Sequence, residues 1–400
     1  MQLPEAFITR TKALLGDEWD AFEQALNQKP PVSIRLNPHK AGKEALSDFE
    51  VESPVPWASN AYYLSARPVF TLDPLFHAGC YYVQEASSMF LEHFIKNHIY
   101  KPVKALDLCA APGGKSTHLS ATLPEGSLLV ANEVIRTRVN ILSENLIKWG
   151  NPNTVVTNNH PKEIGKLKSY FDLIVCDLPC SGEGMFRKDP VAVSEWSVGN
   201  VKRCAERQRQ IINDVYPALK PGGILIYSTC TYNREENEEN IDWICKEFEM
   251  ELLEEPRRFL SHKTKGEGFF IAGLRTPVIA GMTRNPSHCE DEVRSNPVIK
   301  NLDCFTPFAM TGSKNKKGMI PNHALAMSTT LSEDAFPRWD VNKETALKYL
   351  RREALQNIPP AVPLGFVIVT YRNQPLGFIK NIGTRANNLY PQEWRIRKLF

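Results

Sequence analysis

Two cysteines follow short apolar runs, and a pair of thiols in such positions could perform covalent chemistry. Cys180 lies in the sequence DLPCSG, after the apolar run 173–176. Cys230 lies in the sequence YSTCT, after the apolar run 224–227. Ligands and reactive groups gather at strand ends in open α/β sheets. The two thiols therefore suggest covalent catalysis in which one sulfur attacks and the other assists release.

The alternative for each thiol is a buried core cysteine, which is the commonest state of a free cysteine. Two thiols at neighbouring strand ends, both beside a glycine-rich loop, favour chemistry over packing. Cys109 and Cys176 are better explained as core residues. A zinc site is not expected, because no paired Cys or His motif accompanies Cys176 and Cys180.

The glycine-rich loop is the segment 109–116, CAAPGGKS, which follows a predicted strand and opens a predicted helix near Lys115. Small residues and two glycines allow a ligand to approach the backbone closely. The first amides of the helix point at the same place. A loop for nucleoside triphosphates needs four residues between its glycines, whereas Gly113 and Gly114 are adjacent. The loop therefore predicts a different nucleotide-like ligand.

An acid at the end of the next predicted strand narrows the choice of ligand. Glu133 lies about 20 residues beyond the loop, where an acid binds the ribose diol in dinucleotide-binding folds. The alternative is a structural turn followed by a surface glutamate. Loop and acid together predict an adenosine-type cofactor.

Composition limits the class of protein. The chain has 400 residues, 42% hydrophobic residues and a net charge of +3, so RNA or DNA binding has to rest on local patches. Nine cysteines without a regular framework suit a reducing compartment. The first residues lack the pattern of a signal peptide, and the apolar runs are too short to span a bilayer. We expect a cytoplasmic protein with no membrane partner, and the sequence shows no sign of an oligomer interface, so we expect a monomer.

The elements that position these residues alternate between strand and helix over residues 101–280. The predicted strands are 103–108, 127–133, 154–157, 172–177 and 223–230, with a closing strand at 268–272. The predicted helices are 115–123, 136–149, 201–219 and 235–248. This alternation predicts a parallel, doubly wound α/β sheet.

The rest of the chain forms three further regions. Residues 1–100 are predicted to be an α+β accessory region with an amphipathic helix at 84–98. Residues 281–330 are predicted to be a polar connector, and residues 331–400 a β domain with a hairpin turn at 372–375.

Residues near both ends of the chain could bind RNA. Six basic residues follow position 371, namely Arg372, Lys380, Arg385, Arg395, Arg397 and Lys398, interleaved with the aromatic residues Tyr371, Phe378, Tyr390 and Trp394. This composition suits RNA binding or an ordinary β domain equally well. In the accessory region, Arg35, Asn37, Trp57 and Arg67 could add backbone and stacking contacts.

The three motifs together resemble the NOL/NOP/Sun family of RNA cytosine-5 methyltransferases. They are the segments 107–116, 177–182 and 228–233, which occur in the order found in that family. The segments 82–89 and 181–190 resemble its bacterial ribosomal small-subunit methyltransferase F group. The C-terminal sequences GFIKNIG and KLF resemble the PUA-like RNA-binding tail of that group. The resemblance implies a Rossmann-like class I methyltransferase sheet.

The resemblance also implies the cofactor and its contacts. The cofactor would be S-adenosylmethionine, bound by Cys109, Ala110, Ala111, Pro112, Gly113, Gly114, Lys115, Glu133, Arg138, His160 and Asp177. His160 stands where the family often has an aspartate near the adenine, and Asn159 is the alternative. The segment 322–326 resembles a reduced middle module, so RNA selection would differ from that of larger members.

The family pattern implies one role for each thiol. Cys230 would add to carbon 6 of cytosine, which makes carbon 5 nucleophilic. Asp177 would stabilise the adduct through ring nitrogen 3 or the exocyclic amine. Cys180 would then help to eliminate the enzyme from the product, and Lys115 could orient Asp177 or the substrate. The target base has to leave its stack.

The function implied is methylation of a cytidine in ribosomal RNA, most simply 16S RNA or the small ribosomal subunit. The same chemistry on transfer RNA is the closest alternative. DNA is not the expected substrate, because DNA cytosine methyltransferases attack with the cysteine of the Pro-Cys motif, which here is Cys180. A non-catalytic ribosome-assembly factor that retains the fold is the alternative from another class.

Overall fold

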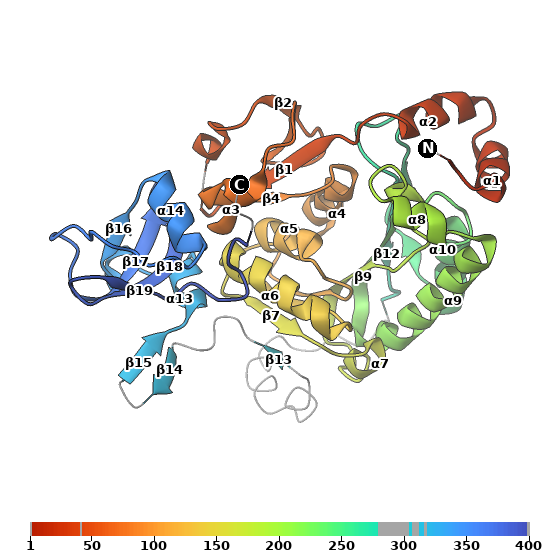
Figure 1. Cartoon of the computed structure of the whole chain (residues 1–400). Coiled ribbons are helices and arrows are strands. Elements are labelled where there is room, and N and C mark those ends of the chain that lie inside the picture. The colour runs from red at the N-terminus through yellow and green to blue at the C-terminus, as the bar shows by residue number, and fades with distance from the viewer. Residues whose placement is uncertain (1, 41, 279–303, 306–311, 316–317, 398–400) are drawn as a thin grey trace.

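A nine-stranded sheet forms the centre of the computed structural model (Figure 1), which describes residues 2–40, 42–278, 304–305, 312–315 and 318–397. Its strands are β5 (Lys104–Asp107), β6 (Leu128–Asn132), β7 (Thr154–Thr157), β8 (Phe171–Asp177), β9 (Leu219–Thr229), β10 (Glu251–Leu252), β11 (Arg257–Phe259), β12 (Phe269–Arg275) and β13 (Cys304–Phe305). The order is β10-β12-β9-β8-β5-β6-β7-β13, with β11 beside β12. Strands β5 to β9 are parallel, which confirms the predicted parallel core.

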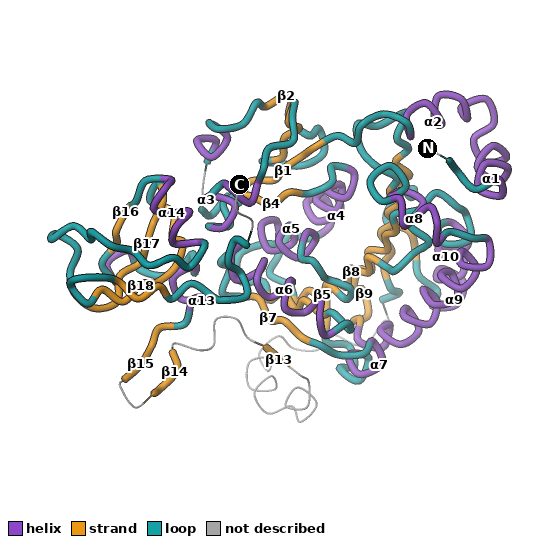
Figure 2. Tube along the Cα trace, in the orientation of Figure 1, coloured by secondary structure: helices purple, strands orange, loops and turns teal. Residues whose placement is uncertain are grey.

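Helices cover both faces of this sheet (Figure 2). The helices of this part of the chain are α4 (Leu91–His98), α5 (Gly114–Thr122), α6 (Arg136–Trp149), α7 (Pro161–Ile164), α8 (Pro190–Glu195), α9 (Val198–Val215) and α10 (Glu238–Phe248). Apolar residues of α4, α5 and α6 pack on one face, and those of α7, α9 and α10 on the other. Successive strand residues alternate between the two cores, as Ala105 and Leu106 do.

The sequence-based boundaries agree with the structure for some elements and differ by a few residues for others. The predicted segments 136–149 and 154–157 agree with α6 and β7. Helix α9 starts three residues early, because the Ser197 side chain accepts the backbone N–H of Asn200. The closing strand β12 runs antiparallel to β9, so the sheet is not parallel throughout.

The accessory region adds a small antiparallel sheet that is separate from the central sheet. Its elements are α1 (Glu5–Leu15), α2 (Trp19–Leu26), α3 (Pro74–His77), β1 (Val32–Leu36), β2 (Val51–Pro54), β3 (Ala61–Leu64) and β4 (Tyr81–Val83), and the sheet order is β2-β3-β1-β4. The helix predicted over 84–98 is shorter. Gln84 still hydrogen-bonds to β1 through its backbone, and Glu85 then accepts the amides of Ser87 and Ser88. A short 3-10 turn therefore precedes α4.

The described residues of the C-terminal part form a two-stranded sheet, a four-stranded sheet and two helices. Its elements are β14 (Gly312–Asn315), β15 (Gly318–Pro321), α13 (His323–Met327), β16 (Arg338–Asp340), α14 (Lys343–Leu350), β17 (Gly365–Tyr371), β18 (Gln374–Asn381) and β19 (Ala386–Asn388). The turn between β17 and β18 has only two central residues, Arg372 and Asn373, both with positive φ. Most of the predicted connector 281–330, and Lys398, lie outside the described residues.

The aromatic residues of the basic tail are core residues, contrary to a role in stacking RNA bases. Phe378 and Tyr390 are each 1% exposed, and Tyr371 is also buried. Trp394 packs against the core that contains Tyr371 and Tyr390. That core is shared with the accessory region, because Ile34 and other residues of its sheet join the same apolar cluster. The basic residues of the tail that are described remain at the surface.

Candidate active site

The two thiols meet at the carboxyl ends of neighbouring parallel strands. Cys180 lies three residues after the end of β8, and Cys230 directly follows β9. Their Sγ atoms are 3.1 Å apart, and both cysteines are free thiols. The backbone N–H of Gly184 donates to the Cys230 carbonyl at 2.9 Å, so the two loops are also joined through the main chain. This arrangement brings together the pair that the sequence singled out, whereas Cys176 is a core residue as predicted.

Asp177 and Lys115 form an ion pair beside the thiols. Lys115 Nζ lies 2.9 Å from Asp177 Oδ2, and the Ser228 hydroxyl donates to Asp177 Oδ1 at 2.8 Å. The Asp177 side chain is 36% exposed, so its carboxylate remains accessible from solvent. Lys115 is nearly buried and lies 4.9 Å from the centre of the Phe269 ring. The lysine of the cofactor loop thus reaches the carboxylate at the end of β8.

The ionisation of the thiols and of Lys115 follows from these contacts. The hydrogen bond with Cys230 and burial raise the pKa of the Cys180 thiol well above its usual value. Burial alone would lower the pKa of Lys115, but the charge of Asp177 and the hydrogen bond to it raise that pKa above its usual value. Asp107 and Cys230 act in the same direction. The site therefore holds a protonated thiol and a cation next to Cys230.

The predicted cofactor loop surrounds the start of α5. Gly113 has φ of 115°, a conformation that favours glycine, and it precedes the first residue of the helix. Asn145 donates to the Pro112 carbonyl at 2.8 Å, and Arg138 donates to the Ala111 carbonyl at 2.6 Å. Helix α6 therefore holds the loop from the side, and the loop residues Cys109, Ala110 and Gly114 complete the turn.

Three buried oxygens at successive strand ends fit a polar cofactor. Asp107 Oδ1, Glu133 Oε2 and Asn159 Oδ1 are buried and accept no hydrogen bond within the described parts of the chain. Glu133 Oε2 makes only an ion pair of 3.3 Å with Arg138. Buried oxygens of this kind normally have donors. Donor groups of a ribose, an adenine or an α-amino group would satisfy them, so this edge of the sheet fits an adenosine-type cofactor.

His160 and Asn159 differ in what their side chains do. The His160 side chain is exposed and accepts the backbone N–H of Lys162, so it caps α7. Asn159 is buried beside Asn132, which accepts its backbone N–H at 3.0 Å. Of these two residues, Asn159 is the one with a buried oxygen that accepts no hydrogen bond in the described parts of the chain, and Asp107, which was not predicted as a site residue, shares this property. A signal was available for Asp107, since it ends the strand before the loop.

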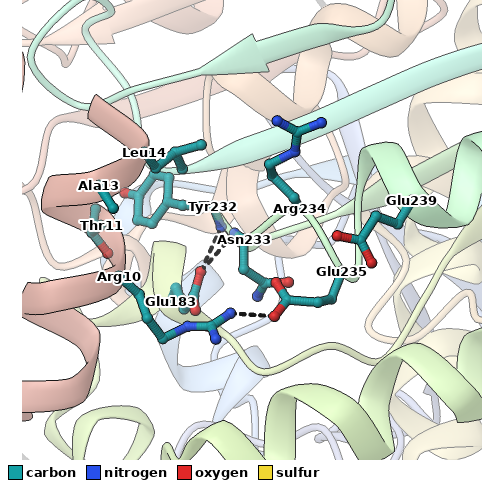
Figure 3. Close-up of a pocket in the computed structure, with 10 residues that line it drawn as sticks. All are labelled: Arg10, Thr11, Ala13, Leu14, Glu183, Tyr232, Asn233, Arg234, Glu235 and Glu239. Atoms are coloured by element: carbon teal, nitrogen blue, oxygen red, sulfur yellow. Dashed lines mark hydrogen bonds and ion pairs between the residues drawn. The ribbon is translucent and has the colours of Figure 1, made fainter. Parts of the chain in front are cut away.

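Two buried carboxylates, also not selected from the sequence, hold the thiol loops. Glu183 accepts the backbone N–H groups of Tyr232 and Asn233 at 2.8 and 2.9 Å (Figure 3). Glu236 accepts the backbone N–H of Ser181 at 3.0 Å. Each loop therefore supplies a carboxylate to the other.

A cavity of about 430 Å³ lies between α1 and the residues that follow Cys230, and the two thiols do not line it. In Figure 3, α1 forms one wall, and the residues that follow Cys230 form the opposite side. Arg10 and Glu235 form an ion pair across it. Neither thiol nor Asp177 lines this cavity, so it is not the reaction site.

Family comparisons divide the chain into three matched parts. The description "16S rRNA methyltransferase RsmB/F" matches residues 101–275. The "N-terminal domain of 16S rRNA methyltransferase RsmF" matches residues 3–86, and the "Methyltransferase RsmF PUA domain" matches residues 336–396. The predicted Rossmann-like sheet, accessory region and PUA-like domain are thereby confirmed. Within the described residues, no helix is long and apolar enough to cross a membrane.

Curated relatives match over nearly the full chain. A ribosomal RNA small subunit methyltransferase F from Pectobacterium atrosepticum is 38% identical, over 98% of this chain and 95% of the relative. The protein of the same description from Cronobacter sakazakii is 30% identical, over 98% of this chain and 96% of the relative. These matches confirm the resemblance that the motifs indicated.

Two solved structures share the central architecture. A methyltransferase homologue from Pyrococcus horikoshii is 28% identical, with a TM-score of 0.60 over 68% of this chain and 95% of that chain. NSun6 from Pyrococcus horikoshii with SFG is 20% identical, with a TM-score of 0.59 over 68% of this chain and 98% of that chain. The second likeness concerns the fold alone.

Proposed function

Because this chain belongs to the ribosomal RNA small subunit methyltransferase F family, we propose that it methylates carbon 5 of a cytidine in 16S ribosomal RNA through a covalent cysteine adduct. Its cofactor is S-adenosylmethionine. The observation that carries the proposal is the 3.1 Å contact between Cys180 and Cys230 beside the Lys115–Asp177 ion pair. A methyl transfer that needs no covalent adduct would have no use for two thiols there.

The residues of the site suit an addition and elimination on the cytosine ring. The Cys230 thiolate adds to carbon 6, and carbon 5 then gains the electron density needed to take up a methyl group. S-adenosylmethionine supplies that methyl group in electrophilic form when bound. A solvent water molecule then takes up the carbon 5 proton, and the electrons of that bond form the double bond between carbons 5 and 6. The bond between carbon 6 and Cys230 Sγ breaks with its electron pair on sulfur, and the thiolate released is stabilised by the adjacent Cys180 thiol.

The charges around Cys230 favour its role as the nucleophile over Cys180. Thiolates attack and thiols do not. The raised pKa of Cys180 keeps its proton in place, whereas Lys115 offers Cys230 a neighbouring cation. Cys180 is positioned to take part in release, since it lies against the sulfur that must leave.

Asp177 serves the substrate rather than the cofactor in this proposal. Its Oδ1 accepts from Ser228 and its Oδ2 pairs with Lys115, which fixes the carboxylate at the end of β8. From there it would hydrogen-bond ring nitrogen 3 or the exocyclic amine of the base. Such a positioned group typically contributes about 10²–10⁴-fold to the rate.

The test compares Cys180→Ala with Cys230→Ala on RNA. We expect Cys180→Ala to accumulate a covalent protein–RNA adduct, because attack proceeds and release does not. We expect Cys230→Ala to lose both the adduct and methylation. Adducts would be measured by denaturing gel electrophoresis, and methylation by bisulfite sequencing. Covalent trapping of RNA by Cys230→Ala would overturn the assignment.

The substrate is tested with the same protein. Methylation of 30S subunits and of bulk transfer RNA would be compared, since the site chemistry serves either. We expect cytidine methylation in 30S subunits or 16S RNA only. Such a substrate places the activity in the cytoplasm, where ribosomes assemble. Methylation of transfer RNA alone would move the proposal to the transfer RNA alternative.

A further inference from the structure

The loops that carry the two thiols are tied together by one carboxylate from each loop. Glu183 follows Cys180 in the chain and binds the Cys230 loop, whereas Glu236 follows Cys230 and binds the Cys180 loop. Glu183 is 2% exposed and Glu236 is fully buried. A buried carboxylate is costly unless donors surround it, so two of them at this position need a reason.

Glu236 is surrounded by donors that lead to Cys180. It accepts the backbone N–H of Ser181, the residue after Cys180, at 3.0 Å. It also accepts Asn233 Nδ2 and Gln208 Nε2, both at 2.8 Å. Burial raises the pKa of the Glu236 carboxyl above its usual value, although the hydrogen bonds from Ser181 and Asn233 act in the opposite direction.

Gln208 extends the same contact to the other side of Cys180. Its Nε2 donates both to Glu236 and to the carbonyl of Pro179, the latter at 3.0 Å. The peptide groups on both sides of Cys180 are therefore fixed by one carboxylate and one amide. The Tyr227 hydroxyl donates to Gln208 Oε1 at 3.0 Å, which connects Gln208 and Glu236 to the end of β9.

We propose that Glu236 is a positioning residue that holds Cys180 against Cys230 for the release step. The inference rests on the proposed function and deepens it, since it concerns the same two thiols. Glu236 itself does not reach the reacting atoms and acts through the Cys180 backbone. A carboxylate is required because every group around it is a donor. An amide would turn its own N–H₂ towards one of them.

The test is Glu236→Gln in the full-length protein, assayed for turnover and for covalent adduct on the same RNA. We expect turnover to fall about 10- to 100-fold, because a small misplacement of a reacting group has an effect of this size. We expect the fraction of protein trapped as adduct to rise, as for Cys180→Ala. A variant that merely lost stability would lower turnover and adduct together.

The matched control is Glu235→Gln, one residue away. The Glu235 side chain forms an ion pair with Arg10 and does not bind the Cys180 loop. We expect its turnover and adduct to equal those of the wild type. A second variant, Gln208→Met, removes the Pro179 contact while the carboxylate remains, and we expect it to raise the adduct too.

The double variant Cys180→Ala/Glu236→Gln tests whether the effect of Glu236 depends on Cys180. If Glu236 acts through Cys180, the double variant traps the same fraction of adduct as Cys180→Ala alone. Wild-type turnover in Glu236→Gln and Gln208→Met, or a parallel loss of turnover and adduct in both, would overturn the inference while leaving the proposed function intact. Absence of cytidine methylation by the wild type would overturn the proposed function, and the inference with it.

Discussion

Asp107 makes the stability of the folded protein depend on pH. It is fully buried at the end of β5, where one oxygen accepts the Ser116 hydroxyl at 2.6 Å and the other has no partner among the described residues. Burial raises the pKa of the Asp107 carboxyl to about 7. In the unfolded chain the pKa is about 4. Between these values the folded state holds a proton that the unfolded state has lost.

The sign of the pH effect follows from this difference. The stabilisation is complete below about pH 4 and is lost as the pH rises to about 7. We expect Asp107→Asn to remove this loss, which amounts to at most about 1.4 kcal/mol per pH unit in the free energy of unfolding. Urea unfolding without cofactor at several pH values between 4 and 8 measures it. Asp242→Asn, on the exposed side of α10, should keep the wild-type slope, and an unchanged slope in Asp107→Asn would contradict the assignment.

At the residue scale, the sequence was sufficient for groups whose chemistry lies in their type and spacing. Cys180 and Cys230 each follow an apolar strand and Asp177 ends one, so their meeting at one edge of the sheet could be predicted. Glu236 could not be predicted, because it is one of four glutamates in the segment 235–239 and nothing in the sequence distinguishes the buried one. For His160, the position in the family pattern does not reveal that the side chain caps α7.

At the scale of elements, β1 supports the cofactor loop through Arg35. This side chain is 2% exposed and was expected to bind RNA, but it donates to Gln84 Oε1 at 3.0 Å and Thr117 Oγ1 at 2.7 Å. It also reaches the Gly114 carbonyl in the first turn of α5 and stacks over Trp149. Asn37 is likewise buried and donates to the Trp149 carbonyl. The accessory region is therefore fixed to the helix that begins at the cofactor loop.

Replacing Arg35 should affect both stability and cofactor binding. We expect Arg35→Met to lower the free energy of unfolding by about 3 kcal/mol, because it leaves several buried acceptors without a donor. We also expect weaker binding of S-adenosylmethionine, because the first turn of α5 loses its support. Urea unfolding and calorimetry measure these effects. Arg67→Met, at an exposed position over Phe70, is the control, with a change within about 0.5 kcal/mol.

The alternation of residue types predicted the strand β1, but it did not predict what the inward side chains of that strand contact. Alternation in the segment 32–37 indicated a strand, and a strand was found at Val32–Leu36. Alternation cannot say whether an inward arginine meets solvent, RNA or a second domain. The direction of β12 was missed for a similar reason, since a short apolar run does not reveal whether it pairs parallel or antiparallel.

At the scale of the whole molecule, the two ends of the chain share one hydrophobic core. Ile34 of β1 and Tyr81 of β4 belong to the same apolar cluster as Leu350 of α14 and Val367 of β17. The Tyr390 hydroxyl also contacts His77, and Arg372 pairs with Asp48. Residues more than 250 positions apart thus depend on each other, which no local pattern in the sequence could reveal.

A variant of the shared core tests this dependence. We expect Leu350→Ala to lower the free energy of unfolding by about 2–5 kcal/mol and to increase amide hydrogen exchange in β1 and β17 alike. Ile212→Ala removes the same number of carbons from the core under α9 and should leave the exchange of β1 and β17 much less affected. Faster exchange in β17 alone would mean that the two regions fold independently.

The shared core also sets an order of events during protein synthesis. The sheet of the accessory region leaves the ribosome first, but its partner strands β17 and β18 are made nearly 300 residues later. At usual elongation rates of about 5–20 residues per second, this delay lasts roughly 15–60 s. Throughout that time the apolar face of the early sheet lacks its cover. A nascent chain of this protein should therefore need a chaperone at the ribosome until its last domain emerges.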